Sequence, residues 1–157
     1  MAEGNGITVS VSADPALGTV STDPVRLRQI VYNYLSNAIK FSSRGGLVQV
    51  RAMQQEGETF RLEVADEGDG IKPEELPLMF ADFHQLDRAQ KRAGQGAGLG
   101  LALTKRIVEA QGGYVGVHST FGSGSVFYAV LPRRQPKAPQ HSIPSPIASV
   151  EPSAARD

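Results

Sequence analysis

The stretch NYLSNAIKF, Asn33 to Phe41, places two asparagines four residues apart in a segment that the apolar pattern predicts to be a core helix. At about 100° per residue, Asn33, Asn37 and Lys40 fall within an arc of roughly 60° on one side of that helix. Asparagine is a mediocre helix former, and a buried side-chain amide must find hydrogen-bond partners. One interpretation is a solvated polar face. The other is a site where amide oxygens, which suit Mg²⁺, and an ammonium group, which suits phosphate, converge on a polar ligand.

The helix that carries this stretch is expected to run from Pro24 to about Phe41, with Asp23 as its N-cap. Around it, alternating apolar residues predict strands at 7–11, 48–52, 60–66, 114–119 and 125–131, and a short strand near 18–22. Further helices are expected at 73–80 and 101–110. We therefore expect an α+β fold, a two-layer α/β sandwich whose mixed, mostly antiparallel sheet carries its helices on one face.

Composition restricts the partners and the location of the protein. The 157 residues include 16 basic and 16 acidic side chains, so no overall field draws the chain to nucleic acid or directly to an anionic membrane. The sequence contains no cysteine, which excludes disulfides and favours a cytoplasmic location, including the cytoplasmic part of a membrane-anchored receptor. Pro, Ser and Ala dominate near the end, so residues 1–132 are expected to form the domain and 133–157 a disordered tail or linker.

A second unusual position closes the predicted strand at 60–66. Alternation places Phe60, Leu62, Val64 and Asp66 on one face, so that a carboxylate follows three inward-facing apolar residues. A buried carboxylate is costly unless it accepts hydrogen bonds, and the exocyclic amine of an adenine is a suitable donor. An Asp-Gly turn that simply ends a strand is the structural alternative.

A third signal is the glycine-rich stretch AGQGAGLGL, residues 93–101, directly before the predicted helix at 101–110. Backbone amides that are free of side chains at a helix start form an anion site. The stretch lacks the Gly-Lys-Ser/Thr ending of a Walker phosphate loop and the strand and glycine spacing of a Rossmann turn. A flexible hinge is the structural alternative.

Taken in order, these motifs resemble those of the sensor histidine kinases. NYLSNAIKF resembles their N box, DEGDGI (66–71) their first glycine box and FADFHQLD (80–87) their F box. GQGAGLGLALTKRIVEAQGG (94–113) resembles the second glycine box, and FGSGSVF (121–127) the last glycine turn. The resemblance covers about residues 7–131 and implies the catalytic, ATP-binding domain of a two-component kinase, with the Bergerat-type fold shared with gyrase and the heat-shock ATPase chaperones. The residues Phe83, Gln85 and Asp87 and the Pro-rich tail are more similar to those of hybrid kinases.

The resemblance also implies roles for individual residues. Asn37 coordinates the Mg²⁺ of ATP, Asn33 lies beside the γ-phosphate, Lys40 contacts phosphate, and Gln95 lies near the metal. Asp66 accepts from the adenine amino group, and residues 84–98 form a mobile lid. The remaining implied nucleotide contacts are near the base or line the phosphates: Phe41, Gly68, Gly70, Ile71, Gly96, Gly98, Leu99, Gly100 and Leu101.

The phosphoryl acceptor is expected on another domain, since His84, His118 and His141 lie in the F box, a late strand and the tail. The implied partners are the dimerisation and histidine-phosphotransfer domain of the same kinase and the receiver domain of a response regulator, and the isolated domain is expected to be a monomer. Two alternatives stay open. An ATP-hydrolysing relative would place a glutamate general base where this chain has Asn33, and a binding-only pseudokinase would act through partner contacts.

Overall fold

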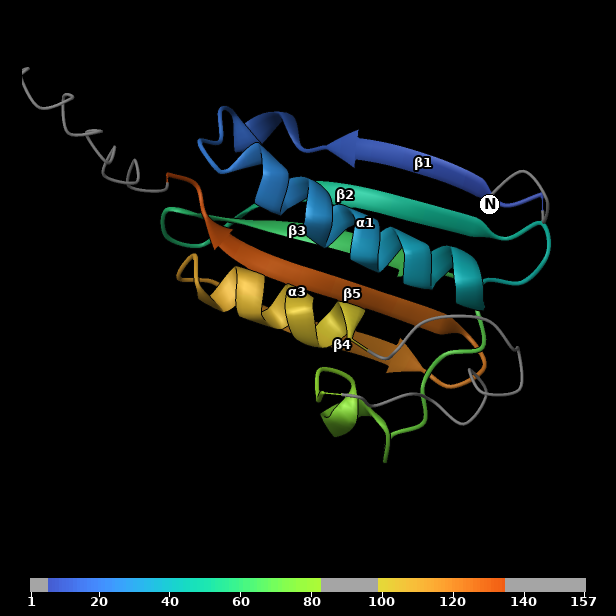
Figure 1. Ribbon diagram of the computed structural model, residues 1–157. Helices are drawn as coiled ribbons and strands as arrows, with labels where there is room; N and C mark the ends of the chain where they lie inside the picture. Colours follow the sequence, from blue (N-terminus) through green and yellow to red (C-terminus); the bar gives the residue numbers. More distant parts are fainter. Residues whose placement is uncertain (1–5, 83–98, 135–157) are drawn as a thin grey trace, which may run out of the picture.

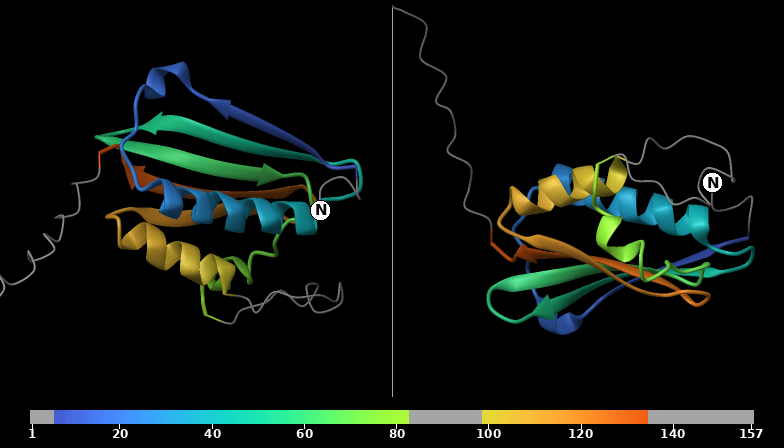
Figure 2. Two further views of the ribbon diagram at one scale, coloured as in Figure 1. Left: turned by 45° about the horizontal axis from the view of Figure 1, so that its top comes forward. Right: turned by 90° about the horizontal axis from the view of Figure 1, so that it is seen from below.

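The computed structural model describes residues 6–82 and 99–134, which form a five-stranded sheet with the order β1-β2-β3-β5-β4. The strands are β1 (Thr8–Ala13), β2 (Leu47–Gln55), β3 (Thr59–Asp66), β4 (Tyr114–Thr120) and β5 (Gly124–Pro132). β1 pairs with β2 in parallel, and the other three pairings are antiparallel. The helices α1 (Pro24–Phe41) and α3 (Gly100–Glu109) lie side by side on one face of the sheet (Figures 1 and 2). The predicted two-layer α+β architecture is confirmed.

Helix α1 begins and ends where its capping residues predict. The Asp23 carboxylate accepts from the backbone N–H of Val25 at 2.8 Å and of Arg26 at 3.3 Å, so it satisfies N–H groups that have no partner inside the helix. At the other end the Ser42 N–H donates to the Ala38 carbonyl at 2.9 Å and the backbone turns to an extended conformation. The polar stripe of the N box therefore lies on regular helix.

The core lies between α1, α3 and the sheet. On α1 the buried residues are Ile30, Tyr34 and Ala38, and Tyr34 is fully buried. Its hydroxyl donates to the Tyr128 carbonyl of β5 at 3.0 Å, and its ring centroid lies 5.8 Å from that of Phe127. Burial raises the pKa of this phenol, so the hydroxyl stays a donor. This contact holds α1 at a defined height above β5.

Two predicted elements were wrong. Residues 73–80 form turns and one short 3-10 helix, η3 (Leu76–Leu78), because Pro77 lacks an N–H and cannot occupy the interior of an α-helix. The segment near Val20 is not a strand and contributes one isolated bridge, between Ser21 and Arg134. A second 3-10 helix, η2 (Pro15–Leu17), leads into it. Within 6–82 and 99–134, neither helix combines the length and apolar character that crossing a membrane requires.

Candidate functional site

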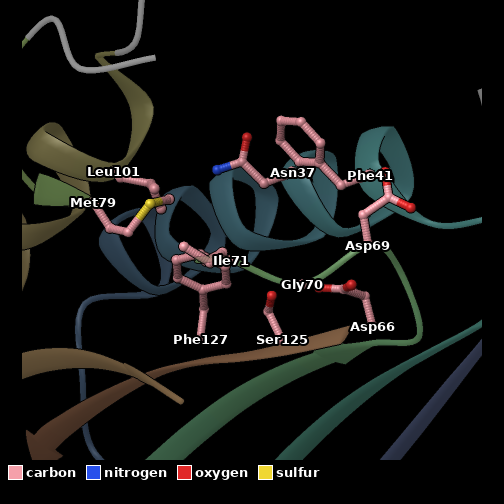
Figure 3. Close-up of a pocket in the computed structure, with 10 residues that line it drawn as sticks. All are labelled: Asn37, Phe41, Asp66, Asp69, Gly70, Ile71, Met79, Leu101, Ser125 and Phe127. Atoms are coloured by element: carbon pink, nitrogen blue, oxygen red, sulfur yellow. The ribbon is translucent and has the colours of Figure 1, made fainter. Parts of the chain in front are cut away.

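A pocket opens between α1, the loop that follows β3, and the start of α3 (Figure 3). Its lining comes from segments far apart in the sequence, which only the fold brings together. The lining residues are Asn37, Phe41, Asp66, Asp69, Gly70, Ile71, Met79, Leu101, Ser125 and Phe127. Six of these ten were predicted as site residues: Asn37, Phe41, Asp66, Gly70, Ile71 and Leu101.

Asp66 supplies a buried carboxylate on the floor of the pocket, at the end of central strand β3 (Figure 3). The residue is 9% exposed, and Phe60, Leu62 and Val64 are buried on the same face, so the predicted facing of this strand is confirmed. Its Oδ1 accepts from the Gly68 N–H at 2.9 Å. Burial raises the pKa of Asp66 and the charge of Asp69 adds to this effect, whereas backbone hydrogen bonds from Gly68 and Ser125 oppose it.

Four buried apolar side chains form walls of the pocket. Ile71, Met79, Leu101 and Phe127 are each less than 10% exposed, and Phe80 braces Phe127 edge to face with ring centroids 6.2 Å apart. A flat, mostly apolar ring with a polar edge directed at Asp66 is the kind of group that such walls accept. The sequence interpretation assigned no pocket role to Met79, Ser125 or Phe127. The alternation of β5 marks Phe127 as buried, but nothing local distinguishes a pocket wall from ordinary core.

The glycines of the first glycine box make room for the protein's own backbone. A Cβ at Gly68 would overlap the Phe41 carbonyl and lie 2.7 Å from the Asp66 Oδ1. A Cβ at Gly70, whose φ is +66°, would overlap the Thr120 carbonyl. The resemblance implies a nucleotide contact for both glycines; Gly70 lines the pocket and Gly68 does not. Their main requirement is the close packing of this loop against α1 and the β4–β5 turn.

Hydrogen bonds join the same loop to the β4–β5 hairpin. The Ile71 N–H donates to Ser119 Oγ at 2.8 Å, and Ser119 Oγ in turn donates to the Gly124 carbonyl at 2.8 Å. The Gly122 N–H donates to the Asp69 carbonyl at 2.7 Å. The loop at the base of the pocket is therefore held to the hairpin by the Ser119 hydroxyl and by one direct main-chain hydrogen bond.

The two asparagines of α1 have different surroundings. Asn37 lines the pocket (Figure 3), whereas Asn33 Nδ2 donates to the Gly100 carbonyl at 3.1 Å and to Thr104 Oγ1 at 3.0 Å, both on α3. Lys40 does not line the pocket, and its Nζ lies 5.4 Å from the centroid of the Phe41 ring.

The residues of the second glycine box are only partly described. Leu99 directly precedes α3 and is 42% exposed, whereas Gly100 is the first residue of the helix. The predicted phosphate and metal residues Gln95, Gly96 and Gly98 lie outside the described residues, as does the rest of the predicted lid.

Residues 22–135 match the family described as histidine kinase-, DNA gyrase B-, and HSP90-like ATPase, and the chain belongs to this family. It is 44% identical over 124 residues to the circadian input-output histidine kinase CikA of Synechococcus elongatus, covering 77% of this chain and 16% of that protein. It is 39% identical over 131 residues to hybrid signal transduction histidine kinase B of Dictyostelium discoideum, covering 81% of this chain and 7% of that protein.

A solved structure gives the same result for the fold. The crystal structure of full-length ShkA in complex with AMPPNP superposes with a TM-score of 0.75 at 37% identity, covering 88% of this chain and 28% of that one. The chain thus spans only a small part of these proteins. Its class is that of the ATPase domain of sensor histidine kinases, as the motifs predicted, and neither the ATP-hydrolysing nor the binding-only alternative is favoured.

Proposed function

We propose that this chain binds Mg²⁺·ATP in the described pocket and catalyses transfer of its γ-phosphoryl group to a histidine on a separate domain of the same kinase, with ADP as the leaving group. The observation that carries the proposal is the buried Asp66 carboxylate at the end of an apolar slot. Such a slot accepts an adenine ring, and the carboxylate is an acceptor for its exocyclic amine. The AMPPNP complex of the relative ShkA supports a nucleotide as the ligand.

The residues around the slot fit the rest of the nucleotide. Asn37 lines the pocket on the side of α1 and offers an amide oxygen to Mg²⁺, with Gln95 proposed as a second metal contact. Lys40, one turn of α1 nearer the C-terminus of the helix, and the first residues of α3 are proposed for the phosphates. The bound Mg²⁺·ATP supplies the phosphoryl group and the charge neutralisation that its transfer needs.

Asn33 and Lys40 are the proposed catalytic residues of the domain. In phosphoryl transfer the protein mainly positions the reacting groups and stabilises charge, and neither of these requires a strong base. Asn33 cannot act as a general base for water, which is consistent with transfer to another protein rather than hydrolysis.

The acceptor is proposed to lie outside this chain. His118 is exposed on β4 and stacks on Tyr128 with ring centroids 5.1 Å apart. Its neighbours Val115 and Val117 pack against the core, so alternation places His118 on the face of the sheet opposite the pocket. We propose residues 1–132 as a monomeric catalytic unit in the cytoplasm, joined through 133–157 to other modules. A dimerisation domain that carries the acceptor histidine and a response regulator receiver domain are its partners.

Calorimetric titration with a non-hydrolysable ATP analogue, with and without Mg²⁺, tests the binding step. The natural protein should bind, and Asp66→Asn should weaken binding by about tenfold or more because it removes a charge-assisted acceptor. Glu67→Gln is the matched control, since Glu67 is the exposed neighbour in sequence and its change should leave the affinity unaltered. No binding by the natural protein would refute the proposal.

Incubation with labelled ATP tests where the phosphoryl group goes. The isolated chain should acquire no acid-labile, base-stable label, and a dimerisation domain from its own kinase should acquire one. Label on this chain alone would contradict the proposed division of labour.

A further inference from the structure

A hydroxyl group is completely buried where α1 meets α3. Thr104 is 0% exposed, and its Oγ1 donates to the Gly100 carbonyl at 2.9 Å and accepts from Asn33 Nδ2 at 3.0 Å. Asn33 Nδ2 also donates directly to the same carbonyl at 3.1 Å. The side chains of Asn33 and Thr104 and the Gly100 carbonyl therefore form a closed triangle of hydrogen bonds.

The donors and acceptors of this triangle follow from the chemistry of its three groups. The amide nitrogen of Asn33 is the donor to both the carbonyl and the hydroxyl, since it carries only N–H groups and lies within hydrogen-bond distance of both. The single hydroxyl proton of Thr104 goes to the carbonyl. A flipped Asn33 amide would place its oxygen against the Gly100 carbonyl, two acceptors in contact, so the triangle fixes the rotamer and the orientation of the amide.

This assignment decides what Asn33 can offer to a ligand. Its Oδ1 is the one polar atom of the side chain that the triangle leaves over, and it accepts no hydrogen bond from the part of the chain that the structure describes. Phosphate oxygens carry no proton to donate to it at neutral pH. A divalent cation or a cation-bound water can meet both an amide oxygen and a phosphate.

We propose that Thr104 is a positioning residue that acts through Asn33: its buried hydroxyl holds the amide so that Oδ1 faces the metal–phosphate part of the nucleotide. The proposal rests on the proposed function. It adds a fully buried residue that lies within the second glycine box and to which the resemblance assigned no nucleotide contact. In a merely structural role the hydroxyl would satisfy the carbonyl four residues earlier in its own helix, as buried threonines often do, and would not affect the metal.

The isosteric change Thr104→Val separates the two roles, because it removes the hydroxyl and keeps the volume. The quantity to measure is the ratio of affinities for a non-hydrolysable ATP analogue in Mg²⁺ and in EDTA. We expect this ratio to fall about tenfold, as for other residues that orient a metal ligand, with little change in EDTA. Thr104→Ser should restore the ratio. Thr59→Val is the matched control, since it removes a hydroxyl that donates to the Glu56 carbonyl at 2.7 Å at the opposite end of β3 from Asp66.

A second readout does not depend on nucleotide. The side-chain amide protons of Asn33, followed by NMR, should exchange slowly with solvent in the natural protein and in Thr104→Ser, and faster in Thr104→Val. If Thr104→Val does not fold, the same NMR measurements on Thr104→Ser and on the natural protein test the proposal. Slow exchange, with an Asn33 shift on adding the analogue that requires Mg²⁺, supports the proposal, and fast exchange or a shift independent of Mg²⁺ overturns it.

The possible failures are distinguishable. An unchanged affinity ratio in Thr104→Val, or an equal loss in Mg²⁺ and in EDTA, overturns the positioning role and leaves the proposed function standing. No nucleotide binding by the natural protein overturns both.

Discussion

The proposed nucleotide site has two ends, the pocket at Asp66 and the contact between α1 and α3 at Asn33, and they are built in different ways. At the Asp66 end, the loop of residues 66–71 packs main chain against main chain, and glycines supply the space. At the Asn33 end, two helices are joined by the side chains of Asn33 and Thr104. Backbone packing tolerates few substitutions, because a new atom must displace a carbonyl that cannot move alone. A side-chain triangle can be taken apart while the helices remain. Stability should therefore depend most on the Asp66 end, and metal-dependent function most on the Asn33 end.

The largest effect is expected for Gly70→Ala. The substituted residue must keep a positive φ, and its Cβ must displace the Thr120 carbonyl. The free energy of unfolding should therefore fall by about 3 kcal/mol, and nucleotide binding should be lost with it. Gly57→Ala is the matched control, because its φ of +68° is similar and a Cβ there meets no described atom within 4 Å. It should cost about 1 kcal/mol. Equal losses in urea unfolding would show that conformation, not backbone packing, governs the Asp66 end.

The Asp66→Asn variant should separate stability from binding. Burial raises the pKa of Asp66 in the folded protein, so the natural chain loses stability as the pH rises from the unfolded pKa through the folded one. The variant cannot ionise. The difference in free energy of unfolding between the variant and the natural protein should be small near pH 4 and should grow in favour of the variant toward pH 7. At pH 7 the variant should bind the nucleotide about tenfold more weakly. Unfolding curves at several pH values measure this, and an advantage that shrinks with rising pH would contradict the assignment.

The Tyr34→Phe change probes the core between the two ends. It removes the hydroxyl that donates to the Tyr128 carbonyl and should lower the free energy of unfolding by about 1 kcal/mol. Because Tyr34 does not line the pocket, the affinity for an ATP analogue should stay within a factor of about two at 25 °C. A large loss of affinity would mean that the height of α1 above β5 controls the site.

The smallest effect is expected for the exposed ion pair between Arg106 and Asp82, 2.6 Å apart with side chains 69% and 47% exposed. Asp82→Asn should change the free energy of unfolding by less than about 0.5 kcal/mol, and salt should reduce the difference further. A larger cost that persists in high salt would show that this contact anchors the segment after η3 to α3.

Local signals predicted much of the fold and part of the site. The capping residue Asp23, the helical stripe and the alternation of residues 60–66 each act over a few residues, and the structure confirms all three. The helix expected at 73–80 does not form, because Pro73 favours a helix start but Pro77 lacks the N–H that a helix interior needs. The segment near Val20 is not a strand, because a strand needs a neighbouring strand to pair with and the sequence of the segment does not specify one.

By itself, the sequence determined which side chains share a face. It placed Asn33 and Asn37 on one side of a helix and Asp66 on the buried side of a strand, because helical and strand periodicity follow from backbone geometry alone. Only the tertiary structure decided that Asn33 turns its amide nitrogen toward Gly100 and Thr104, 67 and 71 residues away. Such a choice depends on which helices pack together and which acceptors their contact buries, and no local pattern contains that information.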